Sequence, residues 1–336
     1  MKSSEIPRRQ FLRDAAIVAG AAAVAANARA TPRTDTPVKQ LEDDLDRFRK
    51  VDPALIRYER ETHFSLPKVD GRRLTTGRDE RLCVAAGNSI LVLDMRGHSL
   101  GEIAASAPVR GIAVASDGTV FAGVKDRVEL FDTRRKRIAT WDAPPGKPLI
   151  TGIAVGERDV FIADAGNRIV WRYDRSGKLA RRIGEKDTAR NIPGFVIPSP
   201  YFDVELGADG LVRVTNPGRH RIETYTADGD LEASWGKPGA GIASFCGCCN
   251  PCNIELLPDG RVVTFEKGLP RVKIFSAQGE LECVVAAPAS FADPGKNPDN
   301  NLGGLDGAID AKGRIYVLDL IASNVQVFAP KKPSAA

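Results

Sequence analysis

The sequence predicts an all-β protein, a six-bladed β-propeller preceded by a short helical segment, and three observations carry this prediction. Five segments share one internal order: an alternating apolar strand, a turn, a second strand and a polar hairpin. Their turn glycines recur at a regular spacing, since Gly210 and Gly260 are 50 residues apart and Gly313 follows 53 residues later. Within the strands, as in "GRVVTFE" at 260–266, side chains alternate between two faces.

These units are expected to close into a ring. A four-stranded sheet of this size cannot bury both of its faces alone, so the units must stack face to face, and closure also protects the edge strands. A degenerate sixth unit, "LTTGRDERLCVAAGNSILVLD", occupies residues 74–94. A two-sheet sandwich is the competing all-β fold, but it does not require six units with one internal order.

The repeat resembles a known family. The segment "TGIAVGERDVFIADAGNRIV" at 151–170 is similar to an NHL repeat, and residues 62–330 as a whole resemble the six-bladed propellers that are built from such repeats. This resemblance implies an interaction platform, which is a fold-level analogy and says little about chemistry.

The two ends of the chain support closure. The last unit supplies only three strands, so the early segment "HFSLP" at 63–67 is predicted to complete the last blade. Residues 31–61 are predicted to be a linker and helix, with helical apolar spacing over 38–61 that is interrupted at Pro53. Residues 331–336 are predicted to be a disordered tail.

The first 30 residues are predicted to be an export signal. The stretch "PRRQFLRDAAIVAGAAAVAANARA" at 7–30 resembles a bacterial twin-arginine (Tat) signal peptide, with small residues near its end for a signal peptidase. Its apolar run is too short to span a bilayer stably, and no later segment approaches a membrane span. We therefore expect a periplasmic protein, tethered to the membrane only if the signal stays uncleaved.

Charge argues against nucleic-acid binding. The signal segment holds five of the 48 basic and two of the 43 acidic residues, so the remaining chain is close to neutral. It has no long basic run with interleaved aromatic residues, and we therefore expect no nucleic-acid partner.

Four cysteines form the most distinctive motif, "FCGCCNPC" at 245–252, in the connection between the fourth and fifth blades. Such connections lie on the face where the central channel opens. Thiolates at these spacings can bind a soft metal ion or an iron–sulfur cluster, and His220 of a neighbouring hairpin could add a ligand unless it is simply solvated. A single structural or redox-active disulfide, such as Cys249 with Cys252, and reduced inert thiols are the alternatives. The motif consists of Cys246, Cys248, Cys249 and Cys252.

Other residues receive plainer interpretations. Cys83 and Cys283 are expected to be small buried core residues. The charged hairpin residues Glu266, Lys267 and Arg271 are expected to be solvated. The long loop at 291–307 is expected to reach the channel face beside the cysteines.

A second constellation lies at the start of the innermost strands. Counting seven residues back from three turn glycines reaches Asp203, Asn253 and Asp306, whereas the second and third blades have Gly111 and Gly152 there. Calcium-dependent propeller lactonases hold their metal with oxygen ligands of this kind, which implies calcium as a cofactor. The alternative is that these residues form local turns with the backbone.

The first hypothesis is therefore an exported binding or redox-accessory propeller that meets an unknown ligand or partner protein through the cysteine site at its channel face. The alternatives are a calcium-dependent hydrolase or lyase of lactonase type and a passive interaction scaffold. Substrate, partner and oligomeric state do not follow from the sequence.

Overall fold

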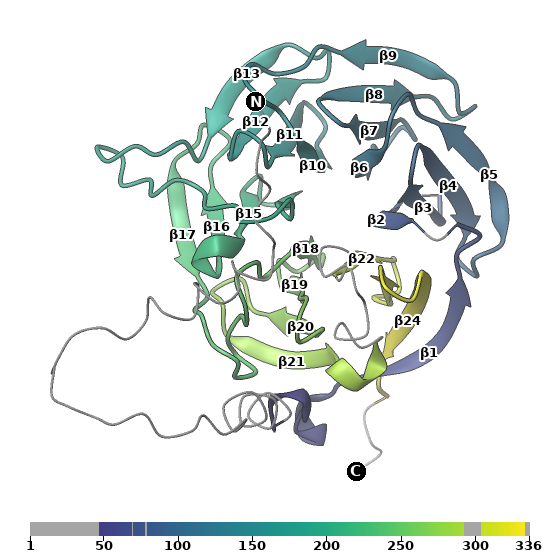
Figure 1. Ribbon diagram of the computed structural model, residues 1–336, viewed down its shortest axis with the longest axis vertical. Coiled ribbons are helices and arrows are strands. Elements are labelled where there is room, and N and C mark those ends of the chain that lie inside the picture. Colours follow the sequence, from purple (N-terminus) through teal and green to yellow (C-terminus); the bar gives the residue numbers. More distant parts are fainter. Residues whose placement is uncertain (1–46, 69, 78, 292–303, 333–336) are drawn as a thin grey trace, which may run out of the picture. The chain divides into compact units, whose positions relative to one another are not determined.

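The protein is a ring of six four-stranded antiparallel sheets, as seen in a computed structural model that describes residues 47–68, 70–77, 79–291 and 304–332 (Figure 1). The predicted six-bladed propeller is confirmed. The predicted signal peptide, the linker up to residue 46 and the last four residues lie outside the described residues. No helix of the described part is both long and apolar enough to cross a membrane.

Each of the first five blades runs from an innermost to an outermost strand in chain order. The first three blades are β2 (Gly71–Thr76), β3 (Arg81–Ala86), β4 (Ser89–Asp94) and β5 (Ser99–Ala104); β6 (Val109–Val114), β7 (Val120–Val124), β8 (Arg127–Phe131) and β9 (Arg137–Trp141); and β10 (Ile150–Val155), β11 (Asp159–Asp164), β12 (Ile169–Asp174) and β13 (Leu179–Ile183). The fourth and fifth are β14 (Val204–Leu206), β15 (Val212–Asn216), β16 (Arg221–Tyr225) and β17 (Leu231–Trp235); and β18 (Asn253–Leu256), β19 (Val262–Phe265), β20 (Val272–Phe275) and β21 (Leu281–Ala286).

The sixth blade joins the two ends of the ring. It consists of β22 (Leu305–Ile309), β23 (Ile315–Asp319), β24 (Asn324–Pro330) and, as its outermost strand, β1 (Tyr58–Ser65). His63 pairs with Gln326 and Phe64 with Val325, so the predicted closure by the early strand is confirmed (Figure 1).

The predicted helix over 38–61 is wrong in its C-terminal part. Arg47 to Arg49 are helical and a 3-10 turn, η1, covers Pro53–Leu55, but β1 already begins at Tyr58. The unpaired edge of β24 accounts for this difference, because an adjacent strand satisfies its backbone groups and a helix would not. Two further 3-10 turns are η2 (Pro217–Arg219) and η3 (Pro288–Ser290).

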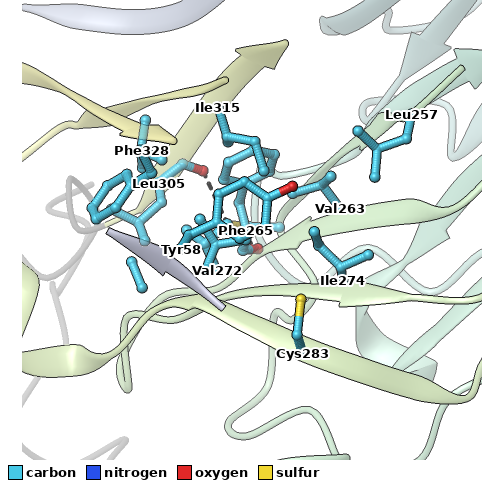
Figure 2. Close-up of a cluster of buried hydrophobic side chains, with 14 residues drawn as sticks. Tyr58, Leu257, Val263, Phe265, Val272, Ile274, Cys283, Leu305, Ile315 and Phe328 are labelled. Carbon is cyan, nitrogen blue, oxygen red and sulfur yellow. Dashed lines mark hydrogen bonds between the residues drawn. The ribbon is translucent and has the colours of Figure 1, made fainter. Parts of the chain in front are cut away.

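The core consists of one hydrophobic cluster at each of the six blade interfaces within the described residues. Strand β19 shows how alternation builds them, because Val263 and Phe265 pack toward the sixth blade whereas Val262 packs toward the fourth. Figure 2 shows the cluster between the fifth and sixth blades, with Phe265 facing Leu305 and Phe328 of the sixth blade. Each blade therefore depends on both neighbours for burial.

The turn glycines adopt the backbone conformation that their spacing implies. Gly118, Gly210, Gly260 and Gly313 have φ values of 82°, 77°, 86° and 74°. Positive φ is easily reached by glycine and is strained for most other residues, which explains its recurrence at this point of each repeat.

Candidate functional site at the channel mouth

The cysteine loop lies in the connection from β17 to β18, as predicted, and its neighbour Tyr201 lines the mouth of the channel. Tyr201, which lines a pocket there, lies close enough to Cys249 and Cys252 for electrostatic interaction with both thiols. Cys252 lies directly before β18, and its backbone N–H donates to Phe265 O at 3.0 Å. The loop therefore belongs to the rim of the channel rather than to the outer wall of the ring.

Asn250 attaches the loop to the β19–β20 hairpin. Its Oδ1 accepts from Lys267 N at 2.9 Å and its Nδ2 donates to Lys267 O at 2.8 Å. The Asn250 side chain is buried, so these hydrogen bonds are protected from water and fix the position of the loop at the channel rim. Lys267 also places its Nζ 4.5 Å from the centroid of the Tyr201 ring.

A buried ion cluster supports the segment before the cysteines. Glu266 Oε2 accepts from Arg271 Nη2 at 2.6 Å, and Glu266 Oε1 forms an ion pair with Lys273 Nζ at 2.6 Å; all three side chains are almost completely buried. Lys273 Nζ also donates to Ile242 O and Ser244 O at 2.9 Å. The expectation that Glu266 and Arg271 are solvated is wrong, because the carbonyl oxygens of the long β17–β18 connection fold over the hairpin and need buried donors.

The four thiols do not converge on one point. Cys248 is exposed, Cys246 is half-buried, and Cys249 and Cys252 are buried. The Sγ atoms of Cys248 and Cys249 are 3.1 Å apart, whereas the Cys252 thiol donates to Phe265 O at 3.0 Å. The structure therefore joins Cys249 to its neighbour Cys248 rather than to the predicted partner Cys252.

Burial makes three of the thiols poor nucleophiles. It raises the pKa of Cys252 to about 12 and also raises the pKa of Cys246 and of Cys249 above the ordinary thiol value. A protonated thiol neither attacks a disulfide nor binds a metal readily. Cys248 is the exposed member of the group and the one that a partner could reach.

His220 contacts the cysteine loop but not a sulfur atom. It follows η2 with a φ of 58°, and its Nε2 lies against the carbonyl oxygen of Gly247. In the described residues, no group of three or more His, Cys, Asp and Glu side chains is arranged to hold a metal ion. The geometry thus gives no support to His220 as a metal ligand.

Cys83 and Cys283 lie where the sequence predicted them. Both are buried in clusters between blades, Cys83 on β3 and Cys283 on β21 (Figure 2). Burial raises the pKa of Cys83 to about 12, which fits an inert core thiol.

The second predicted group, Asp203, Asn253 and Asp306, does come together, but its side chains surround an arginine. Arg73 Nη2 donates to Asp203 Oδ1 at 2.5 Å, its Nη1 donates to Asp306 Oδ1 at 3.1 Å, and Nη1 also contacts Asn253 Oδ1. All four side chains are buried on the channel axis. The guanidinium therefore uses the oxygen atoms that the calcium hypothesis assigned to a metal.

The same residues also bond the blades to one another. Asp203 Oδ2 accepts from Ile254 N at 3.0 Å, Asn253 Nδ2 donates to Leu305 O at 2.8 Å, and Asp306 Oδ2 accepts from Leu74 N at 2.6 Å. Thr151 Oγ1 continues this belt by donating to Phe202 O at 2.7 Å. Each bond runs from one innermost strand to the backbone at the next blade.

The sequence carried a signal for Arg73 that the glycine count missed. In the first blade the turn position is occupied by Glu80, with a φ of 55°, and counting seven residues back from it reaches Arg73. A positive φ is uncommon outside glycine, so the turn escaped a search for glycines. The glycines at the equivalent positions are explained as well, since a Cβ on Gly152 would lie 2.6 Å from Asp203 Oδ1.

Carboxyl groups continue down the channel. Glu205 and Glu255 stand two residues beyond Asp203 and Asn253, so they share the axis-facing side of their strands. Enclosure raises the pKa of both well above the ordinary value, and neighbouring carboxylates add to this effect. Enclosure likewise raises the pKa of Asp306 to about 7, although Arg73 acts in the opposite direction.

These observations bear on calcium binding. A calcium ion needs six or more oxygen ligands, and a cation at the centre of this group would meet the positive charge of Arg73. The residues present therefore do not fit a calcium ion. The predicted channel-face loop at 291–307 lies mainly outside the described residues.

Comparisons with known proteins support the fold. No family model matches the chain, and no curated protein sequence matches it. A solved structure of a streptogramin B lyase is similar over 83% of this chain and 100% of its own, with a TM-score of 0.56 and 15% identity. Virginiamycin B lyase from Staphylococcus aureus is similar over 82% and 100%, with a TM-score of 0.57 and 14% identity. The structure of a protein of unknown function from Bacteroides caccae is similar over 66% of this chain and 83% of its own, with a TM-score of 0.52 and 8% identity. At these identities, the likeness shows the propeller fold alone.

Proposed function

We propose that the protein is an exported binding or redox-accessory propeller in which Cys248 and Cys249 form a redox-active pair on the channel rim. The observation that carries the proposal is the 3.1 Å separation of their Sγ atoms, with Cys248 exposed to a partner. Export to the periplasm, which we infer from the resemblance of residues 1–30 to a Tat signal, would bring the pair into an oxidising compartment.

The chemistry requires a partner that carries a disulfide, either another protein or a small disulfide compound. The Cys248 thiolate attacks one sulfur of that disulfide, and the other sulfur leaves as a thiolate that takes up a proton. The Cys249 thiol, whose raised pKa makes this the slower step, then gives its proton to solvent and attacks the Cys248 sulfur, which displaces the partner's first sulfur. Two electrons pass to the partner, two thiols of the propeller are oxidised, and the reaction is reversible.

The adjacency of the two residues suits cycling more than structural stapling. Neighbouring Cα atoms are about 3.8 Å apart, below the range of about 4.4–6.8 Å that ordinary disulfides span. A disulfide between them would therefore be strained, and strained disulfides are more easily reduced than structural ones.

The test is a redox titration with thiol counting by mass spectrometry in buffers of graded dithiol-to-disulfide ratio. The wild type should lose two reactive thiols, mapped to Cys248 and Cys249, and Cys248→Ser should abolish that transition. Cys283→Ser, which removes a buried core thiol, is the matched control and should leave the transition unchanged. A transition that persists in Cys248→Ser would contradict this pair, and no transition at any ratio would favour a passive scaffold.

Metal or cluster binding through the cysteine loop, with His220 as an added ligand, is the alternative use of the same thiols. Elemental analysis of protein purified from its native export route tests it. A stoichiometric soft metal that is lost in both Cys248→Ser and Cys252→Ser would favour it over disulfide cycling.

A propeller lyase is the second candidate function, and the similarity of fold to two lyases is what favours it. The calcium-dependent form of this hypothesis does not fit the site, because Asp203, Asn253 and Asp306 surround Arg73. Turnover of lactones or esters that persists when a chelator is added would support a propeller lyase or hydrolase without calcium, and no turnover would remove this candidate.

A further inference from the structure

A pocket opens at the channel mouth, and all six blades contribute to it. Arg72 and Arg73 of the first blade, Arg110 of the second and Thr151 of the third line one part of it. Tyr201 at the entrance to the fourth blade, Asn253 of the fifth and Leu320 of the sixth complete the ring. The disulfide chemistry proposed above does not use this pocket.

Three guanidinium groups give the pocket its charge. Arg73 is held by Asp203 and Asp306, and Arg72 pairs with the exposed Asp70 at 3.0 Å. Arg110 is half-buried and has no ion pair or side-chain hydrogen bond within the part of the chain that the structure describes. It is thus a cation at the pocket wall that no acidic side chain of the described residues pairs with.

A second observation also points to a missing ligand. Arg73 is 8% exposed and lines the pocket, yet its Nε is buried without a hydrogen-bond partner. A buried donor without an acceptor is destabilising, so such a group is expected to meet a ligand or ordered water. Arg110 therefore calls for a negative charge, and Arg73 Nε calls for a hydrogen-bond acceptor.

The rest of the wall is apolar. Pro200, Phe202 and Leu320 line the pocket together with the ring of Tyr201. Pockets of this kind bind the apolar body of a ligand, while a few polar groups fix its orientation. A fully hydrated inorganic anion would gain nothing from such a surface.

We propose that the pocket binds a small organic monoanion, a carboxylate that carries an apolar group. Its carboxylate would accept from the fork of Arg110, a geometry that suits guanidinium groups, and its apolar part would lie against Tyr201 and Leu320. The carboxylates of Asp203 and Asp306 contact Arg73 nearby, and they oppose a phosphate dianion more strongly than a monoanion.

Calorimetric titration of the full chain with phenylacetate, and with its neutral analogue phenylacetamide, tests the proposal. Phenylacetate should bind at millimolar concentration or below, and the amide about tenfold or more weakly, which is the loss expected for one charge-assisted contact. Arg110→Gln should weaken phenylacetate binding to a similar extent, and Arg110→Lys, which keeps the charge but not the fork, should fall between. Arg96→Gln removes an exposed arginine elsewhere and should bind as the wild type does.

Three outcomes would overturn the proposal: no binding of phenylacetate, butyrate or acetate; equal binding by wild type and Arg110→Gln; or binding of inorganic phosphate in preference to carboxylates. Melting curves of the Arg110 variants show whether they fold. Cys248→Ser should bind phenylacetate normally, so failure of the thiol chemistry and failure of this pocket are distinguishable.

Discussion

Arg73 is the residue on which the centre of the ring depends. It comes from the first blade and reaches carboxylates of the fourth and sixth blades, because Gly111 and Gly152 leave the intervening positions without side chains. A buried cation of this kind depends on its hydrogen-bonded partners, and removal of one partner from a buried pair costs about 3–5 kcal/mol. Arg73 and its partners therefore stabilise the fold and also shape the pocket.

The carboxyl of Asp306 should make stability depend on pH. Its pKa is raised to about 7 from an ordinary value of 3.8, chiefly by burial, so the folded state binds more protons than the unfolded state between these values. This contribution is fully present below about pH 4 and is lost as the pH rises through 7. The unfolding free energy of the wild type minus that of Asp306→Asn should therefore fall between pH 4 and 7, as measured by urea denaturation. A difference that is flat or that rises with pH would contradict the assignment.

At the scale of elements, the β19–β20 hairpin supports the cysteine loop. Glu266 pairs with both Arg271 and Lys273, and these cations bind the carbonyl groups of the β17–β18 connection. Burial lowers the pKa of Lys273 to about 8 despite the attraction of Glu266, so the ammonium is held in the folded protein at some cost.

Glu266→Gln should lower the unfolding free energy by about 3–5 kcal/mol, because it leaves two buried cations without a counter-charge. The change should also raise the reactivity of Cys246 toward a thiol reagent, since the segment before it loses its support. Glu282→Gln breaks a partly exposed pair with Arg261 and should cost under about 1 kcal/mol. Equal effects of the two substitutions in chemical denaturation would show that the buried cluster is not a support.

At the scale of the whole molecule, closure by β1 is the feature to test. The strand pairs with β24 over Tyr58–Ser65, and Tyr58 is buried in the cluster between the fifth and sixth blades (Figure 2). Removal of residues up to Ser65 would expose the edge of β24 and leave that cluster incomplete.

The shortened chain should melt roughly 10 °C or more below the full chain, because each 1 kcal/mol corresponds to about 2–4 °C in a domain of this size. It should also associate through the open edge, which sedimentation would detect. Removal of residues 1–46 alone keeps β1 and serves as the control. If both truncations melted alike, closure by this strand would not be a source of stability.

The sequence by itself determined the ring. Two local patterns recur from unit to unit: the alternation within strands such as β19 and the turn positions at Gly118, Gly210, Gly260 and Gly313. Because they recur, and because the last unit lacks one strand, the sequence alone predicts the closed ring. The convergence of Asp203, Asn253 and Asp306 followed from the same count.

Only the tertiary structure decided what stands opposite those residues and which thiols meet. The first blade carries its turn on Glu80, so Arg73 was invisible to the glycine count, and the burial of Glu266 depends on a connection that folds back over its hairpin. Ring closure sets side chains from different blades side by side, so charged partners such as Arg73 and Asp203 meet in space although they are far apart along the chain. That is why residue type and spacing predicted where the site lies, while its chemistry required the geometry.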